Sequence, residues 1–109
     1  MDRVFYSAKS AFVHKPAAVI SSSRRAGSVT SMDVLNKHLS ISEMPIVTSN
    51  YWNEVHGHTP SDVEQDREGL DTMYALGKNM AWMLKCIEAG KKAGIEVPQN
   101  KKRTTNFIR

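Results

Sequence analysis

The sequence predicts an α/β fold in which two parallel strands, a crossover helix and a long C-terminal helix form half of a doubly wound sheet. Two short runs, 17–22 and 44–48, are continuously apolar, as strands buried on both faces of a parallel sheet are. The residues between them change to an apolar period of three and four, which indicates a helix. Strand, helix and strand in this order make a βαβ unit with parallel strands.

Size and charge limit the classes of function. The chain has 109 residues and a formal net charge of +4, so it has room for one domain and is only mildly basic. The basic excess gathers in the C-terminal tail, and nucleic acid is therefore not an expected partner. No apolar run is long enough to cross a bilayer, and no membrane contact is expected. The single cysteine, Cys86, favours a reducing compartment, and we expect a cytoplasmic protein.

The elements before the second strand follow from local signals. Residues 4–6 fit the last turn of a helix, and 11–13 fit a short extended piece. Pro16 blocks helix and begins the first strand. Ser28 is the expected N-cap of the crossover helix, which runs to about His38. Its apolar positions are Val29, Met32, Leu35 and Leu39.

The second half of the chain reads as a loop followed by one long helix. The loop, 49–60, is long for a compact domain, which is typical of a functional segment. Ser61 and Glu64 have the spacing of a capping box, and the helix is expected to end near Gly90 or Gly94. A stripe at helical spacing predicts core packing, with Cys86 as a small core residue. The stripe consists of Leu70, Met73, Leu76, Met80, Met83, Leu84 and Ile87.

The first strand ends in a polar turn, 21–28, which is the predicted ligand site. Ligands of open α/β sheets bind outside the carboxyl ends of strands and against the amino ends of helices. The hydroxyls of the three consecutive serines 21–23, two guanidinium groups and helix amides would suit an anion or a polar planar ring. The alternative is a solvated turn with a serine cap. His56 and His58 lack an evident third ligand, so no metal site is expected.

Several blocks of the chain, in order, carry a resemblance. They are KPAAVISSSRRAG (15–27), MPIV (44–47), YWN (51–53) with Gly57, DREGL (66–70) and LGKNMA (76–81). From about Asp2 to Ile95 the chain resembles the flavodoxin-like NAD(P)H-dependent FMN reductases, in the branch of the multimeric flavodoxins and iron-sulfur flavoproteins. The resemblance implies a partial flavodoxin-like domain over 1–95, its two strands being the family's fourth and fifth, and a basic irregular tail over 96–109.

The resemblance also implies a cofactor and a set of residues that bind it. The cofactor is FMN, which takes electrons from NAD(P)H and passes them to a quinone or a similar acceptor. The residues implied to bind it are Ser22, Ser23, Arg24, Arg25, Ala26, Gly27, Tyr51, Trp52 and Asn53. No residue is implied as catalytic. The alternative for Tyr51 and Trp52 is a loop whose aromatic side chains close the edge of the core.

The sequence departs from this family at its amino-terminal half. The family's phosphate-binding loop and its third strand have no counterpart, and the cysteines that bind a cluster in the iron-sulfur members are absent. We therefore expect a truncated C-terminal portion without an iron-sulfur cluster. The alternative is a non-catalytic remnant or interaction fragment that does not bind flavin alone. In either case unpaired strand edges favour a homo-oligomer or a partner chain that completes the sheet.

Overall fold

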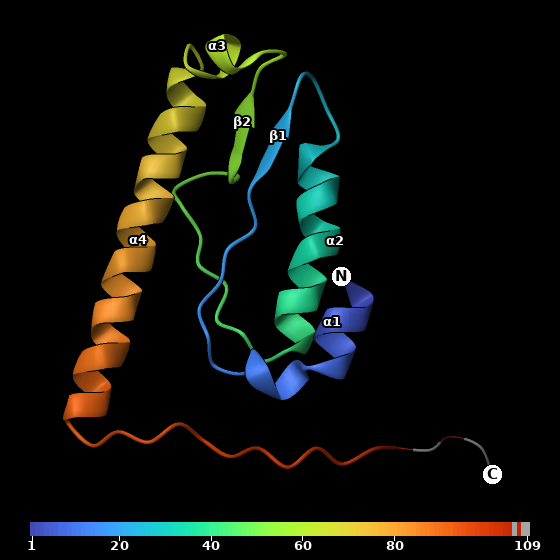
Figure 1. Ribbon diagram of the computed structural model, residues 1–109, viewed down its shortest axis with the longest axis vertical. Coiled ribbons are helices and arrows are strands. Elements are labelled where there is room, and N and C mark those ends of the chain that lie inside the picture. The colour runs from blue at the N-terminus through green and yellow to red at the C-terminus, as the bar shows by residue number, and fades with distance from the viewer. Residues whose placement is uncertain (106, 108–109) are drawn as a thin grey trace.

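The computed structural model describes residues 1–105 and 107 and has a mixed α/β architecture with a two-stranded parallel sheet and a long C-terminal helix (Figure 1). In chain order the elements are α1 (Asp2–Ser7), the 3-10 helix η1 (Lys9–Ala11), β1 (Ser21–Ser23), α2 (Ser28–Ile41), β2 (Glu54–His56), α3 (Pro60–Val63) and α4 (Arg67–Lys92). The predicted order of strand, crossover helix, strand and long helix is confirmed.

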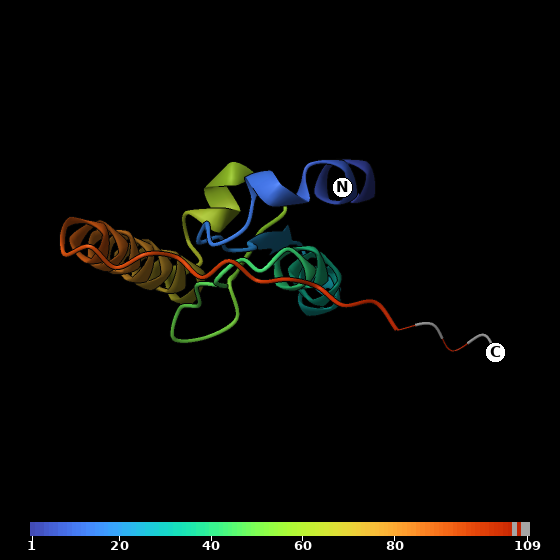
Figure 2. The same ribbon diagram turned by 90° about the horizontal axis from the view of Figure 1, so that it is seen from below.

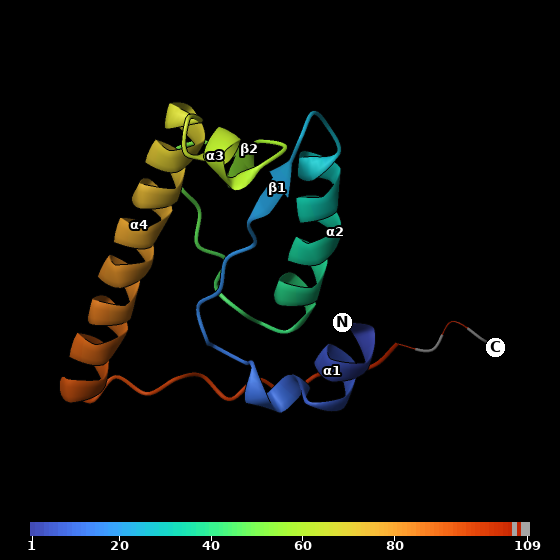
Figure 3. The same ribbon diagram turned by 45° about the horizontal axis from the view of Figure 1, so that its top comes forward.

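The two strands lie side by side between the two long helices, with α2 next to β1 and α4 next to β2 (Figures 1 and 3). They are parallel, and Ser21, Ser22 and Ser23 pair with Glu54, Val55 and His56. Because the register is parallel, both strands end at the same edge of the sheet. The turn after β1 and the loop after β2 therefore begin next to each other.

The second strand lies later in the chain than predicted, and the predicted run 44–48 forms only one bridge. In this run only Ile46 pairs with the predicted first strand, through an isolated parallel bridge to Ala17. The strand that pairs with β1 is β2, which lies inside the predicted loop. The physical reason is a bulge in the chain between Ile46 and Glu54, residues 47–53. Ala17 and Ser21 are four positions apart, whereas their partners Ile46 and Glu54 are eight positions apart, so this part of the chain has four extra residues. The extra residues leave the sheet and shorten both strands.

The first strand is buried on one face only, which corrects the expectation of burial on both. Val19 is buried in the main core cluster with Met32 and Leu39 of α2. Side chains alternate along an extended segment, so Ile20 points to the opposite face, where it is 61% exposed. The partly buried side chains around the cluster are Phe5, Ala17, Leu35 and Met44. The core therefore lies between α2 and one face of the first strand.

The helix ends differ in detail from the predicted ones. The N-cap of α2 is Gly27, in the left-handed region with φ 92°, and not Ser28, which is the first helical residue. The helix continues past His38 to Ile41. A glycine reaches this left-handed conformation without the steric penalty of a Cβ atom, and it therefore sets the start of α2.

The predicted capping box is displaced to an earlier residue. Thr59 accepts a hydrogen bond from the Asp62 backbone, and the Asp62 carboxylate accepts one from the Thr59 backbone. This box opens the short helix α3 and not the long one. α4 begins after its own N-cap, Asp66, whose side chain accepts a hydrogen bond from the Gly69 backbone, and it ends at Lys92.

The apolar stripe of α4 is only partly a core. Leu76 is 7% exposed, which confirms core packing at the end of the helix near β2. Leu84 is 50% exposed and Cys86 is exposed, so the core prediction is wrong for both. Figures 1 and 3 show the reason: the C-terminal half of α4 stands apart from the other helices and the sheet. In the described part of the chain, no helix is both long and apolar enough to span a bilayer.

The segment before β1 and the segment after α4 meet below the sheet. The expected helical turn at 4–6 is part of α1, but the predicted extended piece at 11–13 is the end of η1 and a turn. The tail after α4 passes beneath the other elements (Figure 2), where His14 Nε2 lies 3.1 Å from the Pro98 carbonyl oxygen. Residues 96–105 and 107 contain no helix or strand, and the rest of the predicted tail, with Arg109, lies outside the described residues.

Candidate functional site

The predicted turn lies at the carboxyl edge of the sheet. Ser22 and Ser23 belong to β1, and the next four residues, Arg24, Arg25, Ala26 and Gly27, are exposed and lead into α2. A Cβ atom at Gly27 would meet no atom within 4 Å, so this position is open in space and restricted only by its φ of +92°. The turn is thus exposed at the amino end of α2.

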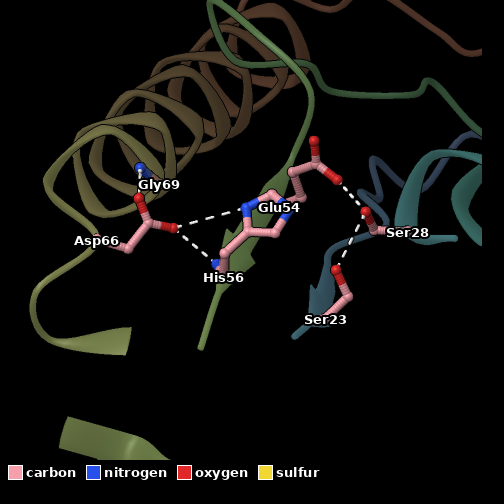
Figure 4. Close-up of polar contacts among 6 residues, drawn as sticks. All are labelled: Ser23, Ser28, Glu54, His56, Asp66 and Gly69. Carbon is pink, nitrogen blue, oxygen red and sulfur yellow. Dashed lines mark hydrogen bonds and ion pairs between the residues drawn. The ribbon is translucent and has the colours of Figure 1, made fainter. Parts of the chain in front are cut away.

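A chain of polar side chains joins this turn to β2 (Figure 4). Ser23 Oγ donates to Ser28 Oγ at 3.5 Å, and Ser28 Oγ donates to Glu54 Oε2. Ser28 is 5% exposed, whereas Ser23 and Glu54 are half-buried. A buried hydroxyl needs a hydrogen-bond partner, and the Glu54 carboxylate supplies one. The contact also ties the start of α2 to the second strand.

A second polar group connects β2 to α4 (Figure 4). The Asp66 carboxylate accepts hydrogen bonds from the His56 backbone N–H at 2.6 Å and from the Gly69 backbone N–H at 3.0 Å. These two bonds, the one from Gly69 first, lower the pKa of Asp66 below its usual range. The imidazole Nδ1 of His56 lies 3.8 Å from Asp66 Oδ2. Asp66 thus fixes where β2 ends and where α4 begins.

The predicted aromatic residues lie elsewhere. Tyr51 and Trp52 belong to the bulge that precedes β2, and they are 61% and 55% exposed. Asn53 attaches the bulge to the first strand. Its side-chain Nδ2 donates to the Val19 backbone carbonyl at 3.1 Å, and its backbone carbonyl accepts from the Ser21 N–H at 3.0 Å. In a parallel pair, the start of β2 is at the opposite end from the turn after β1. The structure therefore does not bring the two predicted groups together.

A cavity of about 530 Å³ lies between α2 and the bulge. Val19 and Met32 contribute apolar surface, and Tyr51 and Trp52 form part of the wall. Two of its lining residues, Asn36 and Asn53, have buried Oδ1 atoms without a hydrogen-bond partner in the described part of the chain. The volume is in the range of small-molecule sites, which are mostly apolar with a few polar groups. None of the residues from Ser22 to Gly27 lines this cavity.

A smaller hollow of about 60 Å³ extends from the bulge toward the edge of the sheet. Tyr51 and Trp52 line it together with Glu54, His56 and Asp66. The two aromatic side chains thus border both the larger cavity and the polar residues of β2. Tyr51 and Trp52 thus connect the larger cavity with the polar groups near the carboxyl edge.

Ser28 lies in the predicted turn but is expected there only as a helix cap, and Glu54 and Asp66 are absent from the predicted site. Glu54 and His56 alternate along β2, which places both on one face of the sheet, but a segment read as a loop carries no such periodicity. The described residues contain no group of three or more metal-binding side chains. Comparisons of the chain with models of protein families, with curated proteins and with solved structures give no match.

Proposed function

We propose that the chain contributes to an FMN site of the flavodoxin-like FMN reductase type, with NAD(P)H as electron donor and a quinone or similar molecule as acceptor. The observation that supports this most is the position of the turn from Ser22 to Gly27. It follows a parallel strand, precedes a helix and is open to solvent. When bound, FMN would supply the redox chemistry, and the residues of the chain would bind and orient it.

The donor set of the turn fits such a group. The exposed guanidinium groups of Arg24 and Arg25 suit a phosphate or another anion, because arginine offers a fork of donors. The open glycine Gly27 lets a planar ring approach the backbone. Tyr51 and Trp52 offer aromatic surface at a cavity that also has unpartnered amide oxygens. The exposed thiol of Cys86 is in keeping with a reducing compartment, and we propose the cytoplasm.

A flavin titration tests this proposal. We expect the purified chain to quench FMN fluorescence with a micromolar dissociation constant, and we expect the double variant Arg24→Ala/Arg25→Ala to bind about tenfold more weakly, since charge-assisted hydrogen bonds are lost. The double variant Lys91→Ala/Lys92→Ala removes the same charge from the far end of α4 and is the matched control. The proposal fails if the unmodified chain leaves the fluorescence and the visible spectrum of FMN unchanged.

A second candidate function, an interaction fragment that does not bind flavin alone, is supported by the outer edge of β1. The backbone groups of Ala17, Ser21 and Ser23 form hydrogen bonds with residues 45–57, on the inner side of the sheet. In an extended strand the residues between them direct their N–H and C=O groups to the other edge. Ile20 belongs to this edge strand, and its side chain, on the face opposite to the core, is 61% exposed. An edge of this kind is a template for pairing with another strand, and we propose a second copy of the chain as the partner.

The molecular mass of the protein in solution tests whether the outer edge of β1 pairs with a second copy of the chain. We expect the chain to elute as a dimer or larger species in size-exclusion chromatography with light scattering. Ile20→Lys should shift it toward the monomer, because a charge at an edge opposes pairing. Val34→Lys, which changes a 54% exposed residue of α2, is the control and should leave the mass unaltered. A monomer that melts cooperatively would rule out this pairing.

A further inference from the structure

The cavity between α2 and the bulge carries charge of one sign. One face of α2 borders it through residues at helical spacing, which are Val29, Met32, Asp33 and Asn36. Asp33 is the only charged side chain among the described residues that line the cavity, and no lysine, arginine or histidine of theirs borders it. The cavity is therefore negative, although the chain as a whole has a formal net charge of +4.

The bulge adds two aromatic rings to the wall of this cavity. The ring centroids of Tyr51 and Trp52 are 6.1 Å apart and their planes meet at 52°, so the rings do not stack face to face. A ligand in the cavity would cover part of their exposed surface. The face of an aromatic ring attracts a cation within about 6 Å of its centroid. The aromatic wall therefore favours the same sign of ligand charge as the Asp33 carboxylate.

Two buried amide oxygens of the lining residues are acceptors without a donor. The Nδ2 of Asn53 donates to the Val19 carbonyl, so the orientation of this amide is fixed and its Oδ1 can only accept. The Oδ1 of Asn36 is likewise buried without a partner in the described part of the chain. A buried acceptor that lacks a hydrogen bond is costly, and a ligand donor that reaches it removes this cost. An ammonium group offers only donors.

We propose that this cavity binds a small organic ammonium ion, with an apolar body against the aliphatic and aromatic walls and the charged nitrogen at the Asp33 carboxylate. The volume of about 530 Å³ is in the range of small-molecule sites. The site shares Tyr51 and Trp52 with the implied flavin contacts, but it does not depend on the proposed function. None of the residues from Ser22 to Gly27 lines it, and the phosphate of FMN has the opposite charge.

Three probes with the same phenylpropyl body separate charge from shape. Phenylpropylamine, phenylpropanol and phenylbutyrate carry an ammonium, a hydroxyl and a carboxylate on that body. Each is titrated at neutral pH into the isotopically labelled full chain, and NMR follows the two indole N–H signals. We expect the signal of Trp52, which lines the cavity, to shift, and that of Trp82, which is 66% exposed on α4, to stay in place. The amine should bind about tenfold more tightly than the carboxylate, with the alcohol between them.

A pair of variants tests the role of the carboxylate. Asp33→Asn removes the charge but keeps the shape, and Asp71→Asn removes the same charge at an exposed position of α4 and is the matched control. Circular dichroism shows that both are folded. We expect Asp71→Asn to keep the tenfold preference for the amine and Asp33→Asn to lower it to about threefold, the part that the aromatic rings supply.

The ammonium site is overturned if the amine leaves the Trp52 signal unshifted, if the three probes bind equally well, or if Asp33→Asn keeps the full preference. None of these outcomes bears on the titration with FMN, whose result depends on the turn after β1. The flavin proposal and the ammonium proposal can therefore fail separately.

Discussion

Replacing Asp66 with alanine is expected to lower the free energy of unfolding by about 2–4 kcal/mol, combining the loss of a helix N-cap with that of a partner for a second backbone donor. The carboxylate accepts from Gly69 N–H at the start of α4 and from His56 N–H at the end of β2. The side chain is 19% exposed, so water replaces these bonds only in part. Urea denaturation followed by circular dichroism measures the change.

The controls for this prediction use neighbouring and conservative changes. Asp66→Asn keeps one carbonyl acceptor and should cost about half as much as the alanine variant. Asp71→Ala, at an exposed position of the same helix, should change the free energy of unfolding by less than about 0.5 kcal/mol. Equal, small losses for Asp66→Ala and Asp71→Ala would show that the carboxylate does not join β2 to α4.

The same carboxylate makes stability depend on pH. Hydrogen bonds from Gly69 and His56 lower the pKa of Asp66 in the folded state. A group with a lowered pKa stabilises the fold at pH values above its ordinary pKa, and this contribution is lost as the pH falls through the folded-state pKa. The loss of stability on acidification should therefore be smaller in Asp66→Asn than in the unmodified chain. The lowered pKa of Asp62, which accepts from Thr59 and His58, is retained in that variant.

Leu39→Ala is expected to cost about 2–5 kcal/mol in the free energy of unfolding, because it removes a buried side chain from the main core and leaves a cavity. Leu39 is 5% exposed and packs in one cluster with Val19 and Met32. Leu84→Ala makes the same chemical change on α4 at a side chain that is 50% exposed, and it should cost much less. Thermal melts of the two variants compare the sites. Equal effects would mean that α4 is as well packed as α2.

The regular elements with a clear hydrophobic period could be predicted from the sequence. The period of three and four around Met32 and Leu39 located α2, and the longer stripe located α4. Local chemistry also indicated a cap and a turn near each helix start, although the residues that cap them, Gly27 and Asp66, were not the predicted ones. A cap depends on backbone dihedral angles and on which N–H groups a side chain reaches, and several neighbouring polar residues satisfy the same sequence pattern.

The position of the second strand could not be predicted in the same way. The apolar run 44–48 has a stronger strand signal than the segment Glu54–His56, which contains two polar side chains. Pairing with β1 decides between them, since the bulge before β2 shifts the register by four residues. Strand pairing is a non-local interaction, and propensity is therefore a weak guide to it.

The sequence by itself determined that this protein has a βαβ order, a polar turn with two arginines after the first strand, and a long amphipathic helix. The tertiary structure decided that Ser28 and Glu54 join this turn to the second strand. It also decided that Tyr51 and Trp52 border the cavity between α2 and the bulge and not the turn. The reason is that periodicity and capping act over a few neighbouring residues, whereas Ser28 and Glu54 are 26 positions apart and meet only when the parallel register aligns them.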